Sequence, residues 1–405
     1  MQRGNILIQR IDYSFDIPVD EYKKRAERVR EEMVKRDIDL AIAWGLQLFP
    51  GDIIYLTGFD INLEIGAMIL MTQDDVYLLT GPEAYPAAKI DIKNGEPFGV
   101  SELGCIGVDY SRTPEITNVK DCIKRIFKNH IPKRVAILTF PDFLTTLAYN
   151  AIISGLSSKT EIIYATDILY SLRMVKSASE QKLMKYAASI AIEGMKTVLN
   201  NIKPGMMETQ CSAHACFKVR DLGAHALTFD PIIQSGRRIN TSIGKTYNKI
   251  IEEGDIVAID VGCRYKHYAG HVARTIVAGN PSEKQLRFLQ MGAEACAATG
   301  SQVIYGKSMS NMDKASHEVF IKYGYGQYDT YSCGHGTGFT DGIGEGTATQ
   351  KSEELWPKNI VMMSDVSLSG VPELHGFRFE ECFLIDNNGI TNNITNGLPL
   401  DVFQC

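Results

Sequence analysis

The stretch from Asp255 to Gly279, DIVAIDVGCRYKHYAGHVARTIVAG, constrains the fold most, because it predicts two strands joined by a tight turn. Apolar residues occupy both faces of the first strand. Because side chains alternate between the two faces of a strand, Asp260 shares its face with Ile256. An antiparallel register that pairs Asp260 with His271 would bring a carboxylate and an imidazole to one side of the sheet. A single buried aspartate can also be satisfied by its neighbours alone. Whether Asp260 belongs to a functional site or is an ordinary buried residue therefore depends on the polar stretches farther along the chain.

Polar residues interrupt the C-terminal half at three further places. In CGHGTG, glycines flank His335 and permit close approach of a ligand, although the loop could instead be a turn in which the imidazole caps a backbone group. In DGIGEG, Asp341 and Glu345 fit a solvated loop equally well. In LHGFRFEECFLID, strand alternation turns either Glu380 or Glu381 inward. An inward glutamate near a histidine is a candidate general acid or base.

Composition excludes several classes of protein. The chain has 405 residues, of which 44% are hydrophobic and 22% charged, as expected for a two-domain globular protein. Its net charge of -6 and lack of a basic cluster argue against nucleic acid as a partner. No run approaches the roughly 18 apolar residues of a membrane span, and no signal peptide is evident, so we expect a cytoplasmic protein that does not engage a membrane. Nine cysteines without a CxxC pair predict buried thiols.

Local patterns divide the chain into two parts of the α/β (α+β) class. Helices and strands alternate up to Arg173, which predicts a domain of residues 1–172 followed by one of 173–405. The phrase IIYLTGFD reads as a strand. After the boundary, Ser177 with Glu180 three residues later predicts a capped helix. Further helices are expected at 19–36, 86–92, 116–129, 142–156, from 208 onward, at 282–303 and at 309–323.

The order of several motifs resembles the creatinase and aminopeptidase P family. The motifs are LRMVKSASEQKLMKYAASIA, SGRRIN, the predicted hairpin, CGHGTGF and GFRFEECFLID. This resemblance implies the pita-bread fold, in which a small N-terminal α/β domain precedes a C-terminal domain with a curved antiparallel sheet flanked by helices. It also implies a homodimer, because the small domain of creatinase-type relatives leans over the partner's active site.

The resemblance implies five metal-ligand positions, which peptidase members fill with two aspartates, one histidine and two glutamates. Asp260, His335 and Glu380 match three of them. His271 stands at the second aspartate position. Ser364 stands at the remaining glutamate position, with Asp365 one residue later and therefore expected on the opposite strand face.

The departures predict an atypical member without a full dinuclear centre. No cofactor is expected, although Asp260, His271, His335 and Glu380 could hold a single zinc, iron or manganese ion. Ile243 falls where the family has a catalytic histidine, which argues against a conventional prolyl peptidase.

The favoured function is hydrolysis, or elimination, at a carbon–nitrogen bond of a small non-peptide substrate. Creatinase-like acid–base catalysis would use Glu380 as base, His335 or His271 as acid and Asp260 as the orienting group. A cationic substrate would suit Glu64, since creatinase holds a carboxylate there with arginine. The other substrate-binding candidates are Arg274, Glu381, Asp341 and His375. A metal-dependent Xaa-Pro aminopeptidase or dipeptidase with an altered metal site, and a non-catalytic binding module, are the alternatives.

Overall fold

The computed structural model describes residues 11–405 apart from 62–63, 106, 114, 129, 242, 341, 343–344, 402 and 405. The chain forms two compact units, one of Ile17–Arg173 and one of Met174–Cys405 that also includes the residues up to Asp16. The division after Arg173 lies where the sequence patterns change, but residues 11–16 belong with the C-terminal unit rather than with the N-terminal one.

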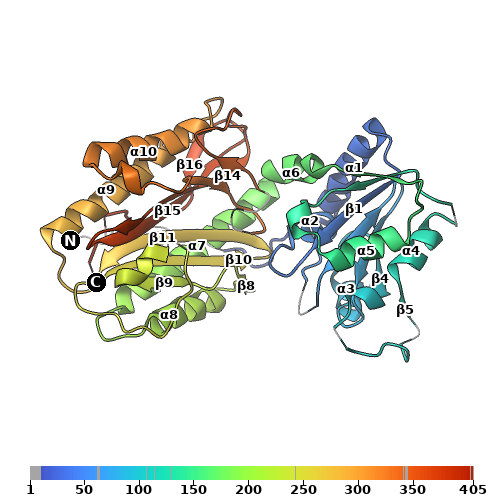
Figure 1. Ribbon diagram of the computed structural model, residues 1–405, viewed down its shortest axis with the longest axis horizontal. Helices are drawn as coiled ribbons and strands as arrows, with labels where there is room; N and C mark the ends of the chain where they lie inside the picture. Colours follow the sequence, from blue (N-terminus) through green and yellow to red (C-terminus); the bar gives the residue numbers. More distant parts are fainter. Residues whose placement is uncertain are drawn as a thin grey trace. The chain divides into compact units, whose positions relative to one another are not determined.

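The N-terminal unit is a mixed sheet with helices (Figure 1). Its strands follow the order β5-β4-β3-β2-β1-β6-β7. The strands are β1 (Leu40–Gly45), β2 (Ala67–Met71), β3 (Val76–Thr80), β4 (Glu96–Val100), β5 (Ile116–Thr117), β6 (Arg134–Ile137) and β7 (Glu161–Tyr164). The helices are α1 (Val19–Lys35), α2 (Gly51–Thr57), α3 (Tyr85–Asp91), α4 (Val119–Ile126), α5 (Thr146–Ser154) and α6 (Thr166–Met174), which crosses the boundary.

The prediction of a strand at IIYLTGFD is wrong, because most of this segment is helix α2. Pro50 precedes the helix, and Gly58 ends it in the left-handed region at φ 73°. Every residue of α2 is buried, so the helix shows no polar face that would have revealed its period.

The C-terminal unit is built on an antiparallel sheet. Its strands are β8 (Ala226–Leu227), β9 (Ile232–Ser235), β10 (Ile256–Tyr265), β11 (Tyr268–Val277), β12 (Gly334–Gly336), β13 (Thr347–Ala348), β14 (Ile360–Val371), β15 (His375–Ile385) and β16 (Thr391–Asn393). The main path runs β13-β12-β14-β15-β11-β10-β8, with β16 paired to β15 and β9 to β10. The helices are α7 (Ala178–Asn201), α8 (Glu208–Asp221), α9 (Glu283–Gly300) and α10 (Ser310–Tyr323).

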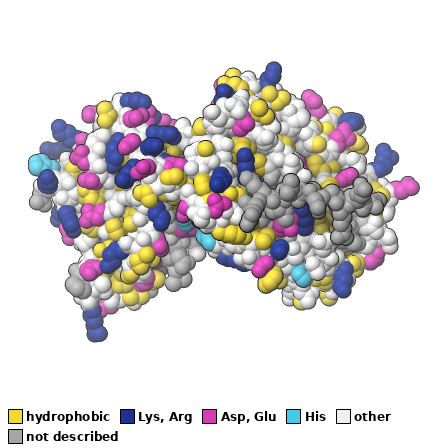
Figure 2. Space-filling model, turned by 180° about the vertical axis from the view of Figure 1, so that it is seen from behind, with side chains coloured by type: hydrophobic (Ala, Val, Ile, Leu, Met, Phe, Trp, Pro, Cys, Tyr) yellow, Lys and Arg dark blue, Asp and Glu magenta, His cyan; other side chains and the backbone are white. Residues whose placement is uncertain are grey.

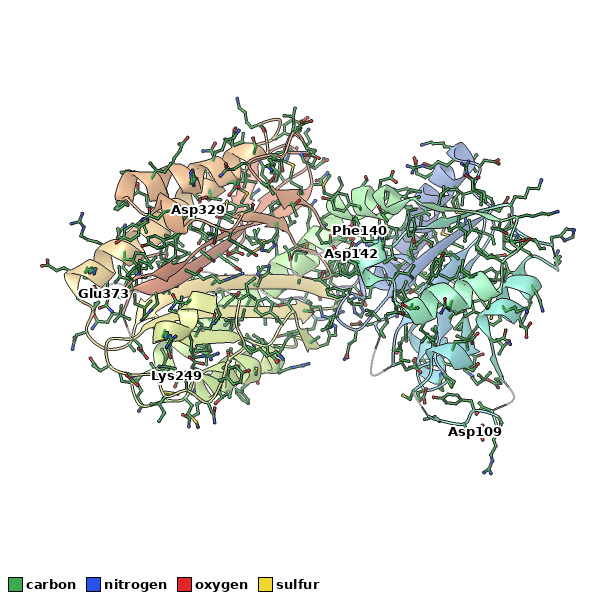
Figure 3. The ribbon with its side chains drawn as sticks, in the orientation of Figure 1. Asp109, Phe140, Asp142, Lys249, Asp329 and Glu373 are labelled. Atoms are coloured by element: carbon green, nitrogen blue, oxygen red, sulfur yellow. The ribbon has the colours of Figure 1, made fainter. Side chains whose placement is uncertain are left out.

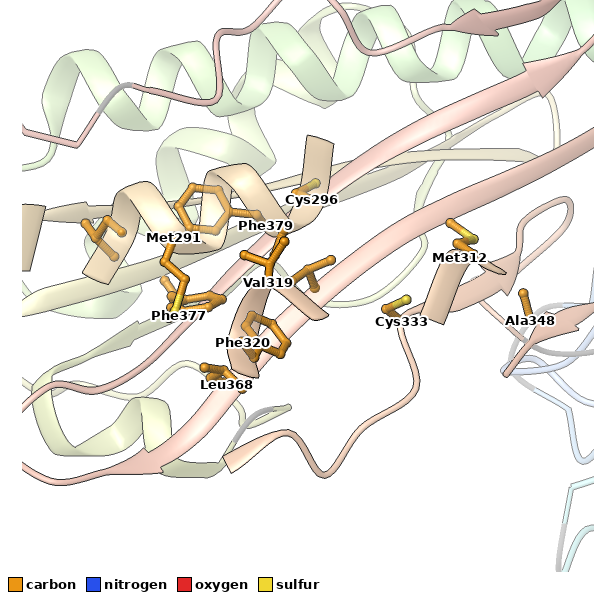
Figure 4. Packing of buried hydrophobic residues seen from close by; sticks show 14 of the residues in the cluster. Met291, Cys296, Met312, Val319, Phe320, Cys333, Ala348, Leu368, Phe377 and Phe379 are labelled. Carbon is orange, nitrogen blue, oxygen red and sulfur yellow. The ribbon is translucent and has the colours of Figure 1, made fainter. Parts of the chain in front are cut away.

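Helices flank this sheet as predicted. Helix α7 packs against β10 and β11, and α9 packs against β14 and β15. Figure 4 shows the apolar core at α9, where Phe377 and Phe379 of β15 lie near Met291 and Cys296. This packing fixes the long strands β14 and β15, which carry much of the site described below.

Helix α7 begins as the sequence predicted. The Ser177 hydroxyl accepts a hydrogen bond from the Glu180 N–H (3.1 Å), while the Glu180 carboxylate accepts one from the Ser177 N–H (2.7 Å). The other oxygen of Glu180 accepts a bond from the Tyr268 hydroxyl at 3.1 Å. The capping box therefore also fastens α7 to the start of β11.

The surface agrees with the charge pattern of the sequence. On the face shown in Figure 2, basic and acidic side chains are interspersed rather than segregated. Among the described residues, no helix combines the length and apolar character needed to cross a bilayer. The eight cysteines with described placement are free thiols, and most of them are buried.

Candidate functional site

Five adjacent strands, β12, β14, β15, β11 and β10, turn polar side chains to one face of the C-terminal sheet. Ala273 of β11 pairs with Glu380 of β15, which pairs in turn with Asp365 of β14. Directly opposed residues of antiparallel strands share a face, and so do residues two apart on one strand. The same reasoning places six side chains together, and we call them the polar cluster: Asp260, His271, His335, Asp365, Arg378 and Glu380.

The predicted pairing of Asp260 with His271 is wrong by two residues. Asp260 lies opposite Ala273, and His271 lies opposite Gly262. A shift of two preserves the face of every side chain, because the strand period is two. The carboxylate and the imidazole therefore still reach the same side of the sheet, as expected.

Arg378 occupies the middle of the polar cluster and was not among the predicted site residues. Its Nε lies 3.2 Å from Asp260 Oδ2, and a terminal guanidinium nitrogen lies 3.0 Å from Asp365 Oδ2. Nε also donates a hydrogen bond of 2.6 Å to Glu380 Oε1. All three carboxylates are at most 1% exposed. The Arg378 guanidinium therefore contacts three buried carboxylates.

Two imidazoles border the acids. Nδ1 of His271 lies 3.0 Å from Glu380 Oε2, so the ring donates its proton to this carboxylate when the glutamate is ionised. The His335 ring stacks on the His271 ring at a centroid separation of 5.7 Å, and its Nε2 is 3.8 Å from Asp365 Oδ2. With its side chain 13% exposed, His335 is the member of the polar cluster most open to solvent.

The shared environment separates the pKa values of the two facing carboxyl groups. Burial acts to raise the pKa of Glu380, but Arg378 and the hydrogen bond from His271 outweigh it and hold that pKa well below its usual range. Burial raises the pKa of Asp365 well above its usual range, because Arg378 offsets it less completely and Glu380 adds repulsion. In this arrangement Glu380 stays ionised while Asp365 is the acid that more readily holds a proton.

Asp365 corrects the prediction that this residue faces away from the site. It enters the polar cluster directly opposite Glu380, whereas Ser364 turns to the other face. There the Ser364 hydroxyl donates to the Cys296 carbonyl at 3.1 Å. The polar cluster thus offers three carboxylates rather than two.

Arg274 and Glu381, predicted to bind substrate, lie on the opposite face. Their side chains pair with each other at 2.8 Å. Arg274 also donates to the main-chain oxygens of Leu398 and Pro399. It reaches Glu380 through the main-chain oxygen of that residue rather than through its carboxylate. The geometry gives these two residues a structural role.

His375, a further substrate-binding candidate, lies outside the polar cluster. His375 begins β15 and contacts Asn240 at 3.3 Å. It is five residues from Glu380, which along a strand is about 16 Å. Glu64, in the N-terminal unit, accepts backbone N–H bonds from Gly81 (2.9 Å) and Ala84 (2.6 Å). Asp341 lies outside the described residues.

The polar cluster has the donors of a metal site. Ligand atoms of Asp260, His271 and Glu380 lie within 4.8 Å of one another, as do those of His335, Asp365 and Glu380. The two groups share Glu380. Carboxylates and imidazoles are the ligands that zinc and iron accept at open catalytic sites, so these residues fit a divalent ion. Asp365 joins the four ligands that the sequence suggested.

The sequence contains a signal for Arg378, although this residue was not among the predicted site residues. Arg378 is two residues before Glu380 in GFRFEE, so any strand that turns Glu380 inward also turns Arg378 inward. Asp365 offered no comparable signal, because its face depends on the register between β14 and β15.

Comparison with known proteins places this geometry in a family. Residues 182–387 match Metallopeptidase family M24. The uncharacterized peptidase YqhT of Bacillus subtilis is 31% identical over 245 residues, covering 60% of this chain and 68% of that protein. The Xaa-Pro dipeptidase of Pyrococcus furiosus is 31% identical over 246 residues, covering 60% and 70%.

Solved structures share the whole fold. The prolidase from Pyrococcus horikoshii has a TM-score of 0.77 at 24% identity, covering 92% of this chain and 98% of that chain. The X-Pro aminopeptidase from Thermotoga maritima has a TM-score of 0.79 at 22% identity, covering 94% and 99%. The pita-bread fold predicted from the sequence is therefore confirmed, and with more than half of its length matched, the chain belongs to metallopeptidase family M24.

Proposed function

We propose that this chain is a metal-dependent hydrolase of dipeptides or short peptides, similar to Xaa-Pro dipeptidases but with an altered metal site. The observation that carries the proposal is the convergence of five metal-ligand side chains on one sheet face, with Glu380 common to both groups. The family match supports hydrolysis, and the Pyrococcus relative supports the substrate class. This revises the non-peptide reaction favoured by the sequence alone.

The charges of the polar cluster favour one divalent ion over two. With all three carboxylates ionised and both imidazoles neutral, the Arg378 guanidinium leaves a net charge of about -2, and a proton on Asp365 reduces this charge further. His271 also supplies no second carboxylate oxygen with which to bridge a pair of ions. A bound ion would activate water or polarise the scissile carbonyl. The chain's own groups would orient the substrate, with Asp365 and His335 able to exchange protons beside it.

The acid–base mechanism without metal remains the second candidate, because His271 is hydrogen-bonded to Glu380 and stacked on His335. Such a constellation can move a proton to a leaving nitrogen. Family resemblance and the thiol state of the cysteines support the further proposal of a cytoplasmic homodimer with a small-molecule substrate.

Elemental analysis combined with a substrate panel tests the proposal. We expect about one equivalent of zinc, iron or manganese per chain, and turnover of Xaa-Pro dipeptides that chelation abolishes and metal restores. His335→Ala should lower kcat/KM at least about 100-fold. His317→Ala is the matched control, since His317 pairs with Asp329 (labelled in Figure 3) at 2.6 Å outside the polar cluster.

Chelator-insensitive turnover of guanidino or amidine compounds by protein containing less than about a tenth of an equivalent of metal would instead establish the acid–base candidate. Tight ligand binding without turnover of any substrate would establish a binding module.

A further inference from the structure

A buried lysine at the start of the C-terminal unit contacts the loop that follows His335 and strand β12. Nζ of Lys176 donates to Glu345 Oε2 at 2.6 Å, and both side chains are 1% exposed. Neither residue belongs to the polar cluster. An ion pair this deeply buried is costly to desolvate and is not explained by stability alone.

The loop after His335 folds around the Glu345 carboxylate. A Cβ on Gly338 would lie 2.5 Å from Glu345 Cδ, and one on Gly336 would lie 1.9 Å from the Glu345 carbonyl oxygen. The Gly336 N–H donates to the Gly346 oxygen at 2.8 Å, and the Phe339 N–H approaches Glu345 Oε1 at 3.4 Å. The glycines of GHGTG therefore make room for this glutamate, and not only for a ligand.

Lys176 is itself fixed to the strand that carries Asp365. Its N–H donates to the Asn359 carbonyl at 2.7 Å, immediately before β14. The Gln181 side chain bonds both the Lys176 oxygen and the Asn359 side chain, each at 3.0 Å. The ammonium thus connects the start of β14 to the loop that follows His335.

We propose that Lys176, acting through Glu345, is a positioning residue that holds the His335 imidazole beside Asp365. This proposal rests on the proposed function for the role of His335 in turnover. The placement of the His335 imidazole does not depend on that function. Without the ammonium, the loop loses its contact with Lys176 and the buried Glu345 carboxylate loses its cation, so the loop rearranges and His335, next to Gly336, moves with it. A displacement of about 1 Å is enough to cost roughly 100-fold in rate.

The test compares Lys176→Met, the double variant Lys176→Met/Glu345→Met and Glu208→Gln. Glu208 is the matched control because it is a fully buried carboxylate of the same unit that bonds Ser235 and Arg238 away from this loop. Metal-free protein with ¹⁵N-labelled histidine gives the imidazole signals, and that of His335 is identified by its loss in His335→Gln. The double variant removes the buried carboxylate together with its cation, so it folds even if the single variant does not.

We expect both Lys176 variants to shift the His335 signal, because each lacks the contact between the ammonium and the loop, and to lower kcat/KM about tenfold or more, whereas Glu208→Gln leaves the signal in place. A folded double variant with the His335 signal unmoved would overturn the proposal and leave the pair purely structural. Because the signal is read without metal or substrate, it decides the positioning role even if the wild-type protein hydrolyses no peptide.

Discussion

Replacing Arg378 with methionine should destabilise the C-terminal unit in a way that metal specifically reverses. The guanidinium is 5% exposed and lies 3.0–3.2 Å from Asp365 and Asp260. At an effective dielectric constant of about 20, each such contact is worth about 5 kcal/mol before desolvation is counted. Removing one partner from a buried charged group leaves a net loss of about 3–5 kcal/mol. In a domain of about 250 residues this lowers Tm by roughly 6–20 °C.

A divalent ion should recover much of this loss. In Arg378→Met the polar cluster carries about one more negative charge, so it should bind a cation more tightly than the wild-type site does. Binding at a concentration 100 times Kd adds roughly 2.7 kcal/mol to the free energy of unfolding. Calorimetric melting in chelator and then in zinc or manganese measures both quantities.

Arg274→Met is the matched control for this experiment. Arg274 is fully buried and paired with Glu381, but on the opposite face of the same sheet. The Arg274→Met substitution should lower Tm, but metal should raise the Tm of this variant no more than it raises the wild-type Tm. The reasoning would be refuted if Arg378→Met melted at the wild-type temperature in chelator, or if metal raised the Tm of the two variants equally.

Two further predictions concern charge. His271→Asp makes the net charge of the polar cluster about -3 and should raise the metal content from one towards two ions per chain, whereas His317→Asp should not; an unchanged ratio would count against our charge argument. Burial, opposed by backbone hydrogen bonds from Ala84 and Gly81, raises the pKa of Glu64 to about 7. Between about pH 4.3 and 7 the folded N-terminal unit therefore binds more protons than the unfolded chain. The protonated Glu64 contributes to the free energy of unfolding at low pH, and this contribution is lost as the pH rises through that range. Urea unfolding at pH 5 and at pH 8 measures the change in the free energy of unfolding. This free energy should decrease less between the two pH values in Glu64→Gln than in the wild-type protein, and equal decreases would contradict the prediction.

Alternation along strands made part of the site predictable. The two-residue period places Asp260 on the same face as every second residue of β10, whatever the exact register. It likewise restricts the choice between Glu380 and Glu381 to one inward residue. An error of two in the register of the hairpin therefore left the prediction of the face intact.

The contacts of individual side chains were less predictable than the sheet faces on which these side chains lie. Arg274 was predicted to bind substrate. Its side chain instead pairs with Glu381 on the opposite face of the sheet, and the carbonyls of Leu398 and Pro399 that bind it come from a distant part of the sequence. Such partners depend on how the chain end packs, which no local pattern encodes.

The position of Asp365 depends on a single extra residue. Near the turn, Val371 pairs with His375, whereas farther along Leu368 pairs with Phe377, so β14 uses one more residue than β15 between these points. Gly370, at φ 76°, lies in this bulge. Without the bulge, the register of the turn would continue and set Val366 opposite Glu380. A carboxylate of the polar cluster thus reaches its face through an irregularity in the backbone, which no local sequence pattern encodes.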